Sequence, residues 1–474
     1  MDFIRGDGPG HPHNEPPTES EATGNGWVVC TPVFKGADIV KRRLTPADWD
    51  WYERLGGTAR IVPQAVLDEK DWELGVTVVA DPPPVVVPPV VVPPIVLPPL
   101  PPLVGREPWL TNPNLFWNRR LPSTTPANPY SAAYRDRIVS YLRTIGAYNV
   151  QESIWPNTNG FTCPIYIADA STPKVYVDFG GGWHGSTRAD GTRIIDGAVT
   201  AYMNRNGGIR IPRGAKVSPA ADHELAVYDS VDNVLYEFWC CLEPGQTVTD
   251  IEGGIGPSRQ VNPTNNYQTM TAGVMENFAT TANGRFIDTP GYANKLWGTA
   301  ATGLTYTGGR ITPYDMDSGV IAHAIDISLP FNLRCNESSW PAWRNDYGSL
   351  NNTQGPPEGL RFRLPAAFDH TTLANPFARM VARCLRDYGA VINDNSGKAS
   401  IRFDSSIGFT SMGKQDPWPS LFAAKEISYA SAGSGAEAMY QSQRNVRVAL
   451  AQIPWEQISF LPSGYGRNPG ELLP

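Results

Sequence analysis

Residues 82–104 form a proline-rich run that restricts the fold of this chain more than any other feature. Eleven of its first 21 positions are proline, and Pro-Pro pairs recur every five residues. Each proline fixes its φ angle at about −65° and lacks a backbone donor, which excludes an α-helix or a central strand. The run therefore predicts a polyproline II rod over residues 81–104, with a length of roughly 65–70 Å.

The spacers between the prolines are Val, Ile and Leu, so an isolated rod would expose a long apolar stripe. The 23 residues carry no charge, and an uncharged segment of this length is long enough to span a membrane. Eleven prolines would, however, leave backbone carbonyls without donors in hydrocarbon, so we expect no stable membrane span. A plain spacer is the simpler alternative. We favour a rod covered by sister copies or by a neighbouring subunit, and hence a homo-oligomer or a place in a larger assembly.

Four further segments flank the rod. Residues 1–26 are rich in Gly, Pro, His, Glu and Thr and are predicted to be disordered. Residues 27–80 predict a small α+β unit, with a strand at 27–34 and a helix at 45–55. About fifty residues make a marginal core, so this unit is expected to anchor to something larger. Residues 105–465 predict one large domain, and residues 466–474 a C-terminal tail.

Composition favours a loop-rich β protein, because Gly and Pro number 45 each and only 18% of residues are charged. The net charge is −7, and no basic cluster alternates with aromatic residues, so nucleic acid is not an expected partner. The six cysteines lack the C-x-x-C spacing of a zinc site, and we expect neither a metal nor a cofactor. The amino terminus does not resemble a signal peptide, which predicts synthesis in a cytoplasm without a secretion signal, although the site of action can lie elsewhere.

Two helices of the large domain share one pattern: an Asn cap, Pro at the first position and Gly just past the end. They are predicted at 128–146 and 375–389. The turn residues at 229–233 predict a hairpin. Short apolar runs predict strands at 174–179, 225–228, 234–239, 321–327 and 360–364. This pattern predicts a mainly β fold, a large jelly-roll-like β-sandwich with two accessory helices.

Three ionisable side chains, His223, Glu237 and His323, are predicted on apolar strand faces, with Asp222 and Asp315 nearby in the sequence. Such groups need partners, because burying an unpaired charge is costly. They could form a cleft in which His and carboxylates act as acid, base or metal ligands. The alternative is a hydrogen-bonded polar cluster inside the β core. The paired-carboxylate spacing of a standard glycosidase is absent, so the residues favour binding over catalysis.

Aromatic residues are the second candidate for function. Trp183, Trp340, Trp343 and Tyr347 lie in loop-like surroundings beside Gly, Pro and Asn. Flat rings stack on the apolar face of a pyranose while polar neighbours bind its hydroxyls, so these residues predict a sugar-binding surface. The alternative is that the rings only close the ends of the sandwich.

Several sequence blocks resemble a known family. Among them are Gly319-Val-Ile-Ala-His-Ala324 and Gly359-Leu-Arg-Phe-Arg363. Over roughly residues 128–400 the chain is similar to a family of uncharacterised bacterial proteins, and related modules occur in minor tail proteins of phages that infect actinobacteria. The resemblance implies a β-sandwich in a virion component near the tail tip, where it meets the host surface. It implies no catalytic residues.

These observations lead to three functional hypotheses. In the first, the chain is a structural and adhesive tail-tip protein: residues 27–104 contact other phage tail proteins, and the sandwich contacts host cell-envelope glycan during adsorption. In the second, the sandwich is an envelope polysaccharide hydrolase that acts through Asp222, His223, Glu237, Asp315 or His323. In the third, the chain is a tail subunit that contacts no ligand.

Overall fold

The computed structural model describes most of the large domain and three short strands near the amino terminus. The described residues are 27–31, 40–43, 61–63, 115–145, 154–179, 204–220, 222–246, 267–269, 271–276, 298–342, 344–429, 443–467 and 470–473. The chain divides into two units, Met1–Val91 and Val92–Pro474. The disordered segment at 1–26, the helix at 45–55 and the rod at 81–104 lie outside the described residues and stay predictions.

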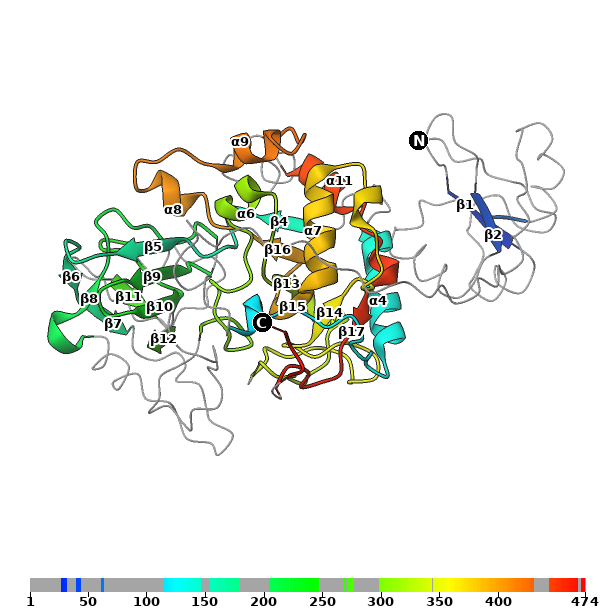
Figure 1. The fold of residues 1–474 in the computed structure, drawn as a ribbon, viewed down its shortest axis with the longest axis horizontal. Coiled ribbons are helices and arrows are strands. Elements are labelled where there is room, and N and C mark those ends of the chain that lie inside the picture. The colour runs from blue at the N-terminus through cyan, green and yellow to red at the C-terminus, as the bar shows by residue number, and fades with distance from the viewer. Residues whose placement is uncertain are drawn as a thin grey trace, which may run out of the picture. The chain divides into compact units, whose positions relative to one another are not determined.

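In the first unit, three strands form an antiparallel sheet with β1 (Trp27–Thr31) between β2 (Val40–Arg43) and β3 (Ile61–Pro63) (Figure 1). The strand predicted from Trp27 is thus present as far as Thr31. β3 is an edge strand that ends on Pro63, and edge strands are where a sheet tolerates a residue without a backbone donor.

The second unit is built around a six-stranded mixed sheet of strand order β17-β14-β15-β13-β16-β4 (Figure 1). β13 pairs in parallel with β15 and antiparallel with β16, so it separates two strands that follow each other in the chain. The strands are β4 (Trp155–Asn157), β13 (Ile325–Leu329), β14 (Arg361–Arg363), β15 (Ala390–Asn395), β16 (Ser400–Arg402) and β17 (Ser459–Phe460).

Helices pack against this sheet, and the two longest are those that the sequence predicts. α4 (Ser131–Ile145) contacts β17, and α7 (Pro376–Asp387) contacts β14 (Figure 1). α7 begins as predicted, because the Asn375 side chain accepts hydrogen bonds from the backbone N–H groups of Phe377 (2.9 Å) and Ala378 (3.2 Å). It ends at Asp387, and Gly389, just past the end as predicted, takes a left-handed φ of 78° while its N–H donates to the Cys384 carbonyl.

The cap of α7 supports a first prediction. Replacing Asn375 by alanine leaves two N–H groups of the first turn without their acceptor, so the free energy of unfolding should fall by about 1 kcal/mol. Urea unfolding monitored by tryptophan fluorescence measures the difference. Asn352→Ala is the matched control, because Asn352 is exposed and the hydrogen bond it accepts from Tyr134 is to its backbone carbonyl, which the substitution keeps. Equal losses in the two variants would contradict the capping role.

A second sheet of the same unit has the strand order β12-β10-β9-β5. Its strands are β5 (Ile165–Ala168), β9 (Leu225–Asp229), β10 (Val234–Trp239) and β12 (Thr271–Glu276). β9 and β10 form the predicted hairpin: Asp229 Oδ1 accepts from the backbone N–H groups of Val231 and Asp232, and Asn233 takes a left-handed φ of 52°.

The remaining elements of the second unit are short. Two-stranded sheets pair β7 (Val177–Phe179) with β11 (Tyr267–Thr269) and β6 (Lys174–Val175) with β8 (Ile209–Arg210). Short α-helices are α6 (Pro313–Ser318), α8 (Ile407–Thr410), α9 (Trp418–Ala423) and α11 (Arg444–Leu450). Turns of 3₁₀-helix are η2 (Phe116–Asn118), η3 (Arg205–Gly207), η6 (Phe331–Leu333), η7 (His370–Thr372) and η8 (Trp455–Gln457).

Both faces of the two central strands of the four-stranded sheet, β9 and β10, are buried. Leu225 and Val227 belong to a smaller apolar cluster on one face. Ala226 and Tyr228, which alternate with them, belong to the main cluster, together with residues of the six-stranded sheet such as Ile327. Because successive strand residues point to opposite faces, one face of this sheet is turned toward the six-stranded sheet. Polar side chains on that face therefore lie between the two sheets.

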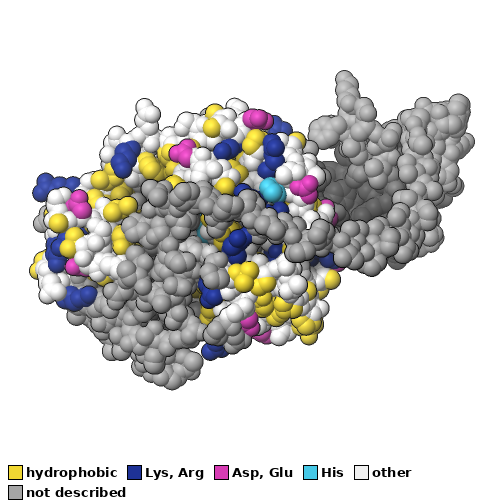
Figure 2. All heavy atoms as spheres, in the orientation of Figure 1, with side chains coloured by type: hydrophobic (Ala, Val, Ile, Leu, Met, Phe, Trp, Pro, Cys, Tyr) yellow, Lys and Arg dark blue, Asp and Glu magenta, His cyan; other side chains and the backbone are white. Residues whose placement is uncertain are grey.

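The described residues contain more strands than helices, which confirms the mainly β class. They also contain four short α-helices, α6, α8, α9 and α11, besides the two predicted ones. The jelly-roll arrangement is not confirmed: a jelly roll is antiparallel, whereas β13–β15, β16–β4 and β5–β9 are parallel pairs. Among the described residues, no helix is both long enough and apolar enough to cross a bilayer. On the face drawn in Figure 2, basic side chains are scattered rather than gathered in one patch.

Candidate functional site

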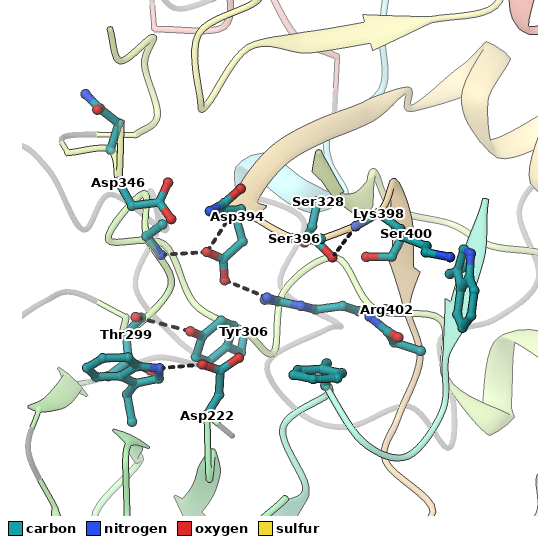
Figure 3. Close-up of a pocket in the computed structure, with 18 of the residues that line it drawn as sticks. Asp222, Thr299, Tyr306, Ser328, Asp346, Asp394, Ser396, Lys398, Ser400 and Arg402 are labelled. Carbon is teal, nitrogen blue, oxygen red and sulfur yellow. Dashed lines mark hydrogen bonds and ion pairs between the residues drawn. The ribbon is translucent and has the colours of Figure 1, made fainter. Parts of the chain in front are cut away.

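A cavity of about 660 Å³ lies between the two larger sheets of the second unit (Figure 3). Its walls combine aromatic rings with carboxylates, guanidinium groups, amides and hydroxyls, which is the chemistry of a site for a polar ligand with apolar faces. The aromatic lining residues are Trp155, Phe161, Trp239 and Tyr306. The polar lining residues are Asn157, Asp222, Thr299, Ser328, Arg344, Asn345, Asp346, Asp394, Asn395, Ser396, Lys398, Ser400 and Arg402.

The open end of the β9–β10 hairpin places Asp222 and Trp239 in the wall. The strand ladder continues past β9 through backbone bonds from Cys240 N to Asp222 O (2.8 Å) and from Cys241 N to His223 O (3.0 Å). Both His223 (φ 41°) and Cys240 (φ 50°) adopt left-handed conformations that non-glycine residues rarely take. The Trp239 indole N–H donates to Asp222 Oδ1 (3.1 Å), so the ring and the carboxyl hold each other in position.

On the opposite wall, Arg402 joins three neighbouring strands of the six-stranded sheet. Its Nη2 donates to Asp394 Oδ2 (2.5 Å), and its Nη1 lies 3.5 Å from Asp326 Oδ2. The guanidinium carbon is 4.3 Å from the centre of the Tyr306 ring. Burial disfavours the charged form of Arg402, but Asp326 and Asp394 outweigh that effect and hold its pKa above the ordinary value. This network fixes the position of the Asp394 carboxylate at the cavity surface.

Several carboxyl groups at and behind the cavity resist ionisation. Burial raises the pKa of Asp222, and the negative charge of Asp394 adds to this effect. Burial also raises the pKa of Glu224 to about 8, that of Glu237 to about 7 and that of Asp326 to about 6. A carboxyl group that keeps its proton near neutral pH can donate it. Of these four groups with a raised pKa, Asp222 lines the cavity, as does Asp346, whose pKa burial also raises.

The structure separates the five residues that the sequence singles out for catalysis, since only Asp222 lines the cavity. His223 is buried beside it and shapes the backbone. Glu237 is fully buried and links β10 to a neighbouring loop: its carboxylate accepts from the N–H groups of Thr299 (3.1 Å) and Tyr306 (2.9 Å), and from the Thr305 hydroxyl. Glu237 thus lies on the strand face that the pattern predicts and is buried as predicted. Its hydrogen bonds, however, give it a structural role.

Asp315 and His323 do come together, but inside the core. His323 Nε2 lies 3.1 Å from Asp315 Oδ2, and its Nδ1 lies 2.9 Å from the Ala324 carbonyl oxygen. Asp315 also accepts from the backbone N–H of Thr312 (2.9 Å) in the capping box of α6. Both side chains are fully buried, so this pair matches the alternative interpretation, a hydrogen-bonded cluster in the core. His323 also precedes β13, so the predicted strand alternation does not apply to it.

The aromatic residues predicted to bind sugar lie elsewhere or are not described. Trp183 and Trp343 are outside the described residues. Trp340 is partly buried with its ring 5.9 Å from that of Phe116, and Tyr347 is exposed at the surface. Neither lines the cavity. Arg344, Asn345 and Asp346, from the same sequence stretch, do line it.

The cavity rings and the Arg402–Asp394 pair are functional candidates that sequence reasoning missed. One signal was available: Asp394 lies just beyond the apolar run at 390–392, and Arg402 interrupts the apolar run at 401–403. Within the part of the chain that the structure describes, no group of three His, Cys, Asp or Glu side chains is arranged to hold a metal ion.

Comparisons with known proteins do not assign this chain to a family. The chain matches no protein-family model, and no curated protein and no solved structure is significantly similar to it. The interpretation of the cavity therefore depends on its own chemistry.

Proposed function

We propose that this chain is a minor tail protein at the tail tip of a phage that infects actinobacteria, and that its cavity binds cell-envelope glycan during adsorption. The observation that supports glycan binding is the composition of the cavity wall, where four aromatic rings lie among carboxylates, guanidinium groups and amides. Cations of the chain already lie over Trp155 and Tyr306. Phe161 and Trp239 are therefore the rings left to stack on a pyranose, and the polar groups offer donors and acceptors for its hydroxyls. The tail assignment is supported by the sequence resemblance alone.

The rest of the chain is included in this proposal. Residues 27–104 contact other tail proteins, the polyproline II rod at 81–104 is covered in a bundle or by a neighbouring subunit, and the large, mainly β domain meets the host surface. The site of action is the virion. The apolar spacers of the rod support the assembly, because a monomer with that stripe exposed to water would associate.

Phe161 offers a clean test of glycan binding, because it lines the cavity and is 47% exposed, so little of the core depends on it. Phe161→Ala should weaken binding to purified host envelope polysaccharide by about two- to tenfold, through loss of one stacking surface. Isothermal titration calorimetry with the full chain measures the change.

The matched control is Phe331→Ala, since Phe331 is 49% exposed and does not line the cavity. Binding by this variant should equal that of the wild type. Equal weakening in both variants, or no binding by the wild-type chain, would overturn the assignment of the glycan to this cavity.

A further inference from the structure

Three carboxyl groups line the cavity. Asp346 is paired with Arg334 (2.9 Å), while the other two come from different sheets and their surroundings differ. Asp222 comes from the end of the four-stranded sheet, and Asp394 from β15 of the six-stranded sheet (Figure 3). One oxygen of Asp222 accepts the Trp239 N–H, while the other has no hydrogen-bond partner among the described residues. This second oxygen is available to carry a proton toward a ligand.

Asp394 is surrounded by donors. Its Oδ2 accepts from Arg402 Nη2 (2.5 Å), and its Oδ1 accepts from the backbone N–H groups of Asn395 (2.9 Å) and Ala301 (3.4 Å). Three donors, one of them cationic, suit a negatively charged carboxylate. The cavity thus combines a desolvated carboxyl on one wall with a hydrogen-bonded carboxylate on the other, which is the division of labour between acid and base that glycoside hydrolysis requires.

We infer that the cavity hydrolyses a glycosidic bond of the glycan it binds, with Asp222 as general acid and Asp394 as general base. This inference rests on the proposed glycan binding. Asp394 accepts a proton from a water molecule, and the water oxygen forms a bond to the anomeric carbon. The bond from that carbon to the leaving oxygen breaks, and Asp222 gives its proton to the leaving oxygen. Solvent then restores both carboxyl groups, so water is the only co-reactant.

The neighbouring side chains position these two groups. The Trp239 indole orients the Asp222 carboxyl, and Arg402 fixes Asp394 while the Tyr306 ring covers its guanidinium. The negative charge of Asp394 also helps Asp222 to keep its proton, because a second ionised carboxylate nearby would be repelled. The same pair thus sets both the direction of proton transfer and the pH range in which it operates.

The test measures binding and cleavage separately, with host envelope polysaccharide as the probe. The wild-type chain should release reducing ends. Asp222→Asn and Asp394→Asn should each lose roughly 100- to 10,000-fold in rate, because an amide neither donates nor accepts the proton. Both should still bind the polysaccharide by calorimetry. Asp136→Asn, at an exposed surface ion pair, is the control and should keep the wild-type rate.

The pH dependence provides a measurement that needs no variant. Only the protonated form of Asp222 can donate, so the wild-type rate should fall as pH rises through its raised pKa, while binding changes less. If the wild type binds polysaccharide but releases no reducing ends, or if Asp222→Asn cleaves at the wild-type rate, hydrolysis is overturned and glycan binding stands. Absence of wild-type binding overturns both proposals.

Discussion

Replacing Arg402 by methionine is expected to lower the free energy of unfolding by roughly 3–5 kcal/mol. Methionine keeps much of the volume of the side chain but removes the cation between Asp326 and Asp394, which are both buried. Each carboxylate would then lack its compensating charge, and desolvation would favour its neutral form. Urea unfolding of the full chain at pH 7.5 or so measures the loss.

Two controls distinguish the buried charge from the loss of a long side chain. Arg213→Met changes the same atoms at an exposed position and should alter stability by less than about 0.5 kcal/mol. Adding Asp326→Asn to Arg402→Met should restore part of the loss, because the amide carries no charge to bury. A loss below about 1 kcal/mol for Arg402→Met, or a double variant no more stable than the single one, would argue against an electrostatic role.

The elements that the sequence predicts well depend on local chemistry. The Asn375 cap, the Gly389 stop and the Asp229 turn each act within a few residues, so their sequence signals specify α7 and the β9–β10 hairpin directly. β10 matches its predicted bounds because its apolar run ends at the turn on one side and at Cys240 on the other. Prediction fails at His323, where the alternating pattern extends beyond the strand that forms.

The candidate site could not be predicted in the same way, because it depends on strand order. Asp394 and Arg402 are eight residues apart in the chain, yet β13 and Asp326 lie between their strands in the sheet. Asp222 enters from another sheet, on a strained backbone beside His223. Periodicity identifies which residues share a face of one strand, but not which strands become neighbours. Sequence reasoning therefore singled out Asp222, whereas the strand order that brings Asp394 and Arg402 to the same cavity could not be predicted.

Raising the pH from about 6.5 to 8.5 is expected to destabilise the fold by about 2 kcal/mol, chiefly through Glu224. Burial raises its pKa from 4.5 to about 8 in the folded state, although the charge of Arg402 opposes that shift. Between those two values the folded chain binds more protons than the unfolded chain, so stability falls as pH rises, by at most about 1.4 kcal/mol per pH unit for one proton. The stabilisation is complete below the unfolded pKa and is lost as pH passes the folded pKa.

Glu224→Gln isolates this contribution, because glutamine has the same shape and no titration. The groups around Glu224, namely Asp222, Asp394, Arg402 and Tyr306, remain in the variant. Its urea midpoint should therefore fall less steeply with pH than that of the wild type, with a residual slope from Glu237, whose pKa is raised to about 7. Glu456→Gln, at an exposed position, should keep the full slope. Parallel curves for Glu224→Gln and the wild type would show that Glu224 is already ionised in the folded chain. Burial would then not disfavour ionised carboxylates in this region, and the acid role of Asp222 would lose its physical basis.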